Sequence, residues 1–146
     1  EPGLVVEPWL TDELLIVCAP HFSLALQAQA RVSLKMLRET GWLLRETGSG
    51  TREAVEHALL PHLHVLQSAG EFSNSEAIKH AAAAGLGVAC LSRVLVSDLL
   101  ALGKLVVLPT ALPPLRRRFY IIHGRQKILS GRLQQFLQFC RNWTPA

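Results

Sequence analysis

The sequence predicts an α/β protein in which strands and helices alternate along the chain. Short apolar runs at residues 13–19 and 42–45 have the length and composition of buried strands. A segment with apolar residues at helical spacing, residues 51–60, follows the second run. This alternation favours βαβ units and a largely parallel sheet. The 146 residues fit one domain, and an apolar content of 49% indicates a packed core.

Local signals place the other elements. Pro20 ends the first strand, and Ser33 can cap a short helix over residues 34–39. Pro61 is expected to end the helix that begins at Thr51. The remaining extended segments or strands are expected at residues 1–10, 63–66, 69–72, 88–91, 105–108 and 119–123, and the remaining helices at 76–84, 93–102 and 130–143.

The charge of the chain is only mildly basic. Fifteen Lys and Arg residues against eleven Asp and Glu give a net charge of +4. Nucleic-acid binding by these residues would need a clustered basic stripe, whereas the densest cluster, at 116–118, is interpreted as a solvated strand end. The longest apolar-and-glycine run, residues 81–91, is too short to span a bilayer. Residues 1–20 lack the pattern of a signal peptide, so no membrane partner is expected.

The cysteines and histidines give no metal-binding pattern. Cys18, Cys90 and Cys140 are far apart and lie in apolar runs, which is typical of buried free thiols in a reducing compartment. His62 and His64 alternate on an expected extended piece, but no acid or Cys partner is suitably spaced nearby. No metal or other cofactor is therefore expected.

A catalytic role finds little support in the residues. The Gly-Ser-Gly tripeptide at 48–50 is too short for a nucleophile elbow, and no Lys follows it as in a P-loop. The alternative of an enzyme on a related α/β scaffold would require Glu46, Glu76 or His80 to share one pocket with an unusual pKa. We therefore expect a protein that binds rather than one that catalyses.

A turn rich in small residues, Glu-Thr-Gly-Ser-Gly-Thr-Arg-Glu at 46–53, joins an expected strand to an expected helix. Gly48 and Gly50 permit positive φ and close approach of the backbone, and Ser49 or Thr51 can cap the helix. A helix N-terminus presents unpaired N–H groups and the positive end of the helix dipole, so this turn can hold an anion. Taken alone, the turn is also explained by an ordinary βα connection.

A second turn, at residues 73–76, again places small polar residues before a helix. It too can be a plain capping sequence when considered alone. Ligands of α/β sheets lie at the carboxyl ends of strands, so two such turns in one sheet favour a shared site. The candidate anion-binding residues are Ser49, Gly50, Thr51, Ser73 and Asn74.

Several sequence blocks carry a resemblance to a known family. They read EPWLTDELLIVCAP near the start, WLLRETGSGTRE at the first turn and NSEAIKHAAAAGLGVACLS at the second, followed by a strand and an amphipathic helix. In this order the chain resembles the effector-binding domain of LysR-type transcriptional regulators over essentially all 146 residues. It is similar to the YeiE-like branch in particular, also because of the segment IHGRQKILS at 122–130.

The resemblance implies a periplasmic-binding-protein-like fold of two α/β subdomains joined by two crossover strands. Residues 20–113 would form subdomain II, and residues 1–19 with 114–146 would form a partial subdomain I that lacks its first half. The winged helix-turn-helix that begins the family's proteins is also expected to be absent from these residues. DNA binding is accordingly expected of the parent protein and not of this chain.

The implied function is bacterial gene regulation in the cytoplasm. A small effector would bind in the cleft, where Ser49, Gly50, Thr51, Ser73 and Asn74 line the side of subdomain II, and would rearrange a DNA-bound homo-oligomer. The chemistry of the turns suits a small anion such as a sulfur oxyanion or a short carboxylate. The alternative is a solute-binding protein of a transport system, which shares the fold but needs export.

A partial subdomain I would leave apolar side chains without neighbours. The residues concerned are Leu14, Ile16, Phe119, Ile121 and the apolar stripe of the last helix. Exposed apolar patches of this kind favour association. The sequence therefore predicts an oligomer, or a remnant of proteolysis, rather than a stable monomer.

Overall fold

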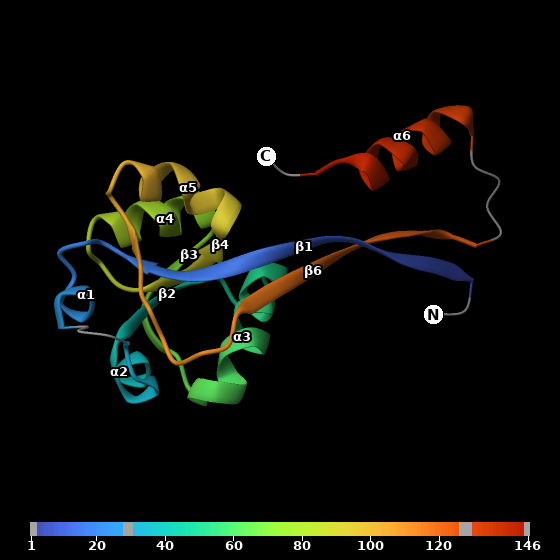
Figure 1. Cartoon of the computed structure of the whole chain (residues 1–146). Coiled ribbons are helices and arrows are strands. Elements are labelled where there is room, and N and C mark those ends of the chain that lie inside the picture. Colours follow the sequence, from blue (N-terminus) through green and yellow to red (C-terminus); the bar gives the residue numbers. More distant parts are fainter. Residues whose placement is uncertain (1–2, 28–30, 126–129, 145–146) are drawn as a thin grey trace. The chain divides into compact units, whose positions relative to one another are not determined.

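The computed structural model describes residues 3–27, 31–125 and 130–144 (Figure 1). Strands and helices alternate through most of the chain, which confirms the predicted α/β class. In chain order the elements are β1 (Leu4–Cys18), α1 (Ser23–Gln27), α2 (Leu34–Glu39), β2 (Gly41–Arg45), α3 (Gly50–Leu63), β3 (Gln67–Phe72), α4 (Ser75–Ala83), β4 (Ala89–Ser92), α5 (Arg93–Ala101), β5 (Val106–Val107), β6 (Leu115–Gly124) and α6 (Gly131–Asn142).

The chain divides into two compact units. Unit 1 contains Glu1–Asp12 and Arg117–Ala146, and unit 2 contains Glu13–Arg116. The long strands β1 and β6 belong partly to each unit, and they pair with each other. The assignment of residues 20–113 to subdomain II of a family domain stays a prediction, as does the assignment of the two terminal segments to subdomain I.

The strands of unit 2 are not all parallel. β2 pairs with β3 in parallel, and a parallel bridge between Trp42 and Val88 connects β2 to the start of β4. β1, by contrast, pairs antiparallel with both β4 and β5. The expectation of a largely parallel sheet is thus wrong for β1. A helical crossover fixes the direction of β3 relative to β2, but it does not fix the direction of β1, which extends into unit 2 from unit 1.

Alternating strand side chains build a core on each face of the strands in unit 2. On one face Trp42, Leu44 and Cys90 pack in a cluster with side chains from α2 and α3. On the other face Leu43 and Leu91 pack with side chains from α4 and α5. Figure 1 shows the two helix pairs on opposite sides of these strands. The carboxyl ends of β2 and β3 are therefore held between two packed layers.

Some element boundaries differ from the predicted ones. Pro61 lies inside α3 rather than ending it, and the helix continues to Leu63, so that residue is not extended as expected. The fixed φ of proline is compatible with a helical turn, and its missing N–H weakens the helix locally without ending it at that residue. His64, with a φ of 67°, ends the helix instead. The helix α1 was not predicted, and the segment 126–129 of the family-like block lies outside the described residues.

The expected exposed apolar face is present only in part. Leu14 and Ile16 are buried, contrary to expectation, because β1 lies between β4 and β5 and contributes both side chains to a core cluster. Ile121 is buried as well and Phe119 is half-buried. The apolar stripe of α6 is only partly buried: Leu137 is 6% exposed, whereas Phe136 is 60% exposed. Within the described residues, no helix is long and apolar enough to cross a membrane.

The cysteines are free, and their surroundings differ. Cys18 and Cys90 are buried as predicted, whereas Cys140 is only half-buried. Burial raises the pKa of the Cys18 thiol to about 11 and that of Cys90 to about 12. Both buried thiols are thus packing residues that stay protonated at neutral pH.

Candidate anion-binding site

Two βα turns lie side by side at one edge of unit 2. Because β2 and β3 are parallel neighbours, their carboxyl ends meet, and Arg45 is in register with Phe72. The N–H of Glu46 then donates to the carbonyl of Phe72 at 3.0 Å. The turn that leads from β2 to α3 and the turn that leads from β3 to α4 therefore start from the same pair of strand ends.

The first turn is closed by local hydrogen bonds. Gly48 has a φ of +93°, and the N–H of Ser49 donates to the carbonyl of Glu46 at 3.1 Å. The Ser49 Oγ accepts from the N–H of Arg52 at 3.2 Å, which makes Ser49 the N-cap of α3. Gly50 is already helical and does not adopt positive φ, so only Gly48 uses the freedom expected of both glycines.

The second turn has the same design. Asn74 is the N-cap of α4, and its Oδ1 accepts from the N–H of Ala77 at 2.8 Å. Ser73 and Asn74 are both exposed. The cap uses the oxygen of the Asn74 side chain, so this side chain offers its NH2 group as a donor. Both helices thus begin with N–H groups and short polar side chains at the same edge of the sheet.

Thr51 occupies a more interior position than the other candidate residues. It is half-buried and lines a small cavity of about 10 Å³ at the ends of β2 and β4. A space of this size holds about one water molecule. The other residues that line it are Leu43, Leu44, Arg45, Val55, Ile78, Cys90 and Leu91. Thr51 therefore lies where the polar turn meets the apolar core.

Two arginines at the first turn were missed by the sequence reasoning. Arg45 donates from Nε to Glu46 Oε1 at 2.8 Å and from Nη1 to Ser75 Oγ at 3.4 Å. Arg52 donates from Nη1 to the carbonyl of Arg45 at 2.9 Å and from Nε to Glu56 at 3.1 Å. Their positions in the sequence could have identified them as candidate site residues. One arginine ends a buried strand, and the other directly follows the small-residue turn.

Carboxylates balance the charge of these arginines. Glu71 lies 3.7 Å from Arg52, and its other oxygen accepts from the N–H of Thr47 at 3.4 Å. The hydrogen bond from Arg45 lowers the pKa of the Glu46 carboxyl below its usual value. The turn thus already attracts carboxylate oxygens from its own chain, and the local net charge is small.

The residues considered for catalysis interact with different partners. Glu76 lies 3.6 Å from His80 on α4, and both side chains are more than half exposed. Glu46 is engaged with Arg45 after a different strand. Glu76 also pairs with Lys79 at 3.1 Å, as expected of a solvated helix face. In the described part of the chain, no group of three His, Cys, Asp or Glu side chains could hold a metal ion.

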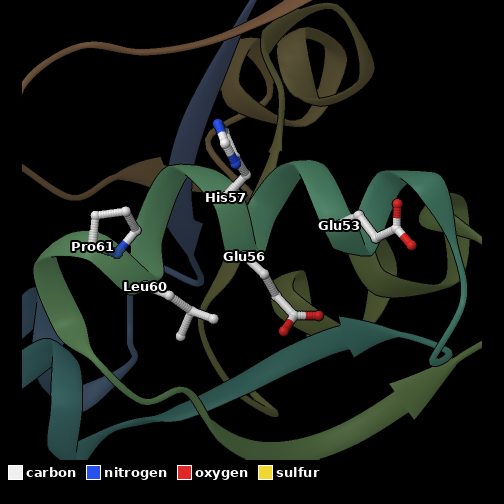
Figure 2. A pocket seen from close by; sticks show the side chains of 5 residues that line it. All are labelled: Glu53, Glu56, His57, Leu60 and Pro61. Carbon is white, nitrogen blue, oxygen red and sulfur yellow. The ribbon is translucent and has the colours of Figure 1, made fainter.

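A wider hollow lies elsewhere in unit 2, on the outer side of α3 (Figure 2). Its volume is about 550 Å³, and it is lined by Glu53, Glu56, His57, Leu60 and Pro61. All five side chains come from one helix. Because no second element supplies an opposing wall, this hollow is an open surface, and the paired turns remain the better candidate site.

The fold is that of a regulatory ligand-binding domain. The family model "LysR substrate binding domain" matches residues 1–145, and the chain belongs to this family. This match confirms the resemblance inferred from the sequence blocks. It also fits the α/β architecture, since regulatory domains of LysR regulators share the fold, among them that of MetR from N. meningitidis (TM-score 0.77, 18% identity, 97% of this chain and 64% of that chain).

The relatives are transcription regulators. The regulator YeiE of Escherichia coli K12, described as an uncharacterized HTH-type transcriptional regulator, is 47% identical over 137 residues, which cover 94% of this chain and 46% of YeiE. A RuBisCO operon transcriptional regulator from Acidithiobacillus ferrooxidans is 34% identical over 137 residues, 94% of this chain and 44% of that protein. The chain spans about half the length of the curated relatives it matches.

A solved structure of a related regulator is similar to this chain in both fold and sequence. The regulatory domain of CcmR from Synechocystis PCC6803, solved in complex with 2-PG, has a TM-score of 0.81 and 30% identity to this chain. The match covers 99% of this chain and 70% of the CcmR chain. At the level of the family, these relatives agree with the expectation of a regulator and not an enzyme.

Proposed function

We propose that this chain is the effector-sensing part of a bacterial LysR-type transcription regulator and that it binds a small anion at the two paired turns. The observation that carries the proposal is the pairing of β2 with β3, which brings the starts of α3 and α4 to one edge of the sheet. The proposed contacts are Ser49, Gly50, Thr51, Ser73 and Asn74. The 2-PG complex of the related CcmR domain supports a small ligand.

The proposed ligand is a compact anion with several acceptor oxygens, such as a sulfur oxyanion or a short carboxylate. Helix N-terminal N–H groups and hydroxyls donate in several directions, and a tetrahedral or planar oxyanion can accept from more than one of them. A large apolar ligand fits less well, because the cavity next to Thr51 has room for about one water molecule.

The proposed output is regulatory. The anion would be sensed without being transformed, and binding would change the arrangement of a homo-oligomer in the cytoplasm. DNA contact would be made by an N-terminal domain outside these residues, since the relatives are HTH-type regulators of about twice this length. The family match and the names of these relatives favour this function over a solute-binding protein of a transport system.

Calorimetric titration of the complete gene product with sulfate, sulfite and short carboxylates tests the proposal. Ser49→Ala and Thr51→Val should each weaken binding of the accepted anion by about 1–3 kcal/mol, because an acceptor or donor in the site is left unpaired. Ser33→Ala is the matched control. Ser33 caps α2 and accepts from Met36 N at 3.2 Å, as Ser49 does from Arg52 N, but it precedes β2 instead of following it.

Both cap variants should lose similar helix stability, about 1 kcal/mol. Only Ser49→Ala should lose affinity. If Ser33→Ala weakens binding as much as Ser49→Ala, the effect is one of general stability and the proposed site is wrong. If none of the anions binds to the wild-type protein, the proposal of an anion sensor fails.

A further inference from the structure

Arg45 lies between the two turns of the proposed site. It is the last residue of β2, and its backbone is in register with Phe72 on β3. Its side chain is 21% exposed, and Nη1 donates to the Oγ of Ser75 in the first turn of α4. Arg45 also lines the small cavity together with Thr51 from the first turn of α3. An anion held by either turn therefore lies within reach of this guanidinium.

In the structure the Glu46 carboxylate accepts a hydrogen bond from this guanidinium. Its Oε1 accepts from Arg45 Nε at 2.8 Å, and the Glu46 side chain is 43% exposed. The backbone of Glu46 is fixed at both polar groups, because its N–H donates to Phe72 and its carbonyl accepts from Ser49. The carboxylate itself can swing into solvent without disturbing these backbone bonds, and an exposed ion pair of this kind is weak.

We propose that the Arg45 guanidinium is the charged contact of the anionic effector and that the Glu46 carboxylate is a built-in competitor which the effector displaces. This inference rests on the proposed function. In this exchange one anionic oxygen replaces another as the acceptor of the same donor, so the guanidinium stays paired. Glu46 lowers the affinity and thereby sets the anion concentration at which the sensor responds.

The exchange also selects the class of anion. A guanidinium donates from several coplanar nitrogens, so it favours ligands with two or more oxygens over a single-atom anion. Sulfate and sulfite should therefore displace Glu46 more effectively than chloride at equal ionic strength.

Four variants of the complete gene product, titrated with sulfate and sulfite in a calorimeter, test this inference. Glu46→Gln keeps the size of the side chain but removes the competing charge, and it should tighten binding by about two- to five-fold. Arg45→Gln should weaken binding by about ten-fold or more, because a charged hydrogen bond is lost. Glu56→Gln is the matched control, since it breaks the similar Arg52–Glu56 pair at 3.1 Å. It should change the affinity by less than about two-fold.

Arg45→Lys is the fourth variant and covers the case in which Arg45→Gln does not fold. It keeps the positive charge but loses the planar donor set, so it should bind sulfate several-fold more weakly than the wild type. Thermal unfolding followed by circular dichroism identifies the folded variants.

The outcomes separate this inference from the proposed function. If Ser49→Ala weakens binding but Glu46→Gln does not strengthen it, the competitor role is overturned and the anion site stands. Equal strengthening by Glu46→Gln and Glu56→Gln would indicate a general charge effect and also overturn the inference. Unchanged affinity in Arg45→Lys would remove Arg45 from the site. If the wild-type protein binds neither sulfate nor sulfite, both proposals fail.

Discussion

The N–H of Glu46 donates to the carbonyl of Phe72 at 3.0 Å and continues the pairing of β2 with β3 by one residue beyond the strand end. The two turns are thus joined by backbone hydrogen bonds and cannot separate unless the strands do. A binding site shared by the two turns would accordingly be pre-organised, which lowers the entropic cost of binding.

The two glycines of the first turn, Gly48 and Gly50, should respond in opposite ways to substitution by alanine. Gly48→Ala should destabilise the protein by about 1–2 kcal/mol, because a side chain at a φ of +93° is strained. Gly50→Ala should be neutral or stabilising by up to about 1 kcal/mol, because this residue is helical. A Cβ at either position meets open space, so a steric clash does not contribute to the difference in stability between the two variants. Urea denaturation measures both, and equal losses would mean that Gly48 does not need its positive φ.

Asn74→Asp should separate helix capping from anion binding. Aspartate caps helices as well as asparagine does, and its charge interacts favourably with the helix dipole, so stability should be kept or increased by up to about 1 kcal/mol. The same charge would repel an anion at the turn, and sulfate binding should weaken by several-fold. The measurements are a thermal melt and a calorimetric titration. Unchanged or tighter binding by the variant would argue against an anion at Asn74.

Lys79 connects α4 to α5 through its hydrogen bonds. We expect it to stabilise the protein mainly through the packing of its aliphatic stem. The residue is 4% exposed, and its Nζ lies 3.1 Å from Glu76, 3.3 Å from Asp98 and 3.3 Å from the carbonyl of Leu95. Lys79→Ala should cost about 1–3 kcal/mol, because both the stem and the charge are removed. Lys79→Met keeps the stem, and its cost should stay below about 1 kcal/mol because both carboxylates are largely exposed. Equal losses in urea denaturation would show that the charge dominates.

The same cluster should make stability depend on pH at both extremes. Burial lowers the pKa of Lys79, but hydrogen bonds to Glu76 and Asp98 outweigh it, so the net shift is upward. Its contribution is therefore complete below the unfolded lysine pKa of about 10.4 and is lost as pH rises through the folded value. The pKa of Asp98 is lowered, first by the Leu99 N–H and then by Lys79, so its contribution is lost as pH falls through the folded value. An alkaline loss that persists unchanged in Lys79→Met would contradict this assignment.

Thiol reactivity should distinguish the three cysteines. Cys18 and Cys90 are buried with raised pKa values, so a thiol reagent at pH 8 should modify them only when the protein opens. Cys140 is half-buried and should react first. The expected count is one rapidly reacting thiol in the native protein and three in denaturant. Rapid reaction of two or more thiols in the native protein would contradict the packing of β1 against β4.

The sequence was sufficient for the elements that carry their own local signals. Ser33 and Asn74 were correctly placed next to helix starts, because a small polar residue before an apolar helical pattern is a direct capping signal. Buried strands at β2 and β4 follow from short apolar runs in the same way. The prediction that Pro61 ends the helix was wrong, because the fixed φ of proline is compatible with a helical turn.

The direction of β1 and the two arginines required tertiary information. The composition of β1 does not predict that this strand lies between β4 and β5. It does not predict the direction of the strand either, because an apolar run can pair with parallel or antiparallel neighbours. Arg45 and Arg52 became visible only when their donors were placed against Ser75, Glu46 and the strand carbonyl. The family resemblance implies the overall architecture, whereas the charge balance of the turn depends on contacts that only the folded chain makes.

An amide NMR titration with sulfate and sulfite tests the central proposal most directly. The account predicts that the largest shifts, saturating with anion concentration, occur at the backbone N–H groups of residues 49–52 and 73–76, at the starts of α3 and α4. Shifts centred instead on residues 53–61, around the open hollow on α3, or the absence of saturable shifts at both turns would contradict it.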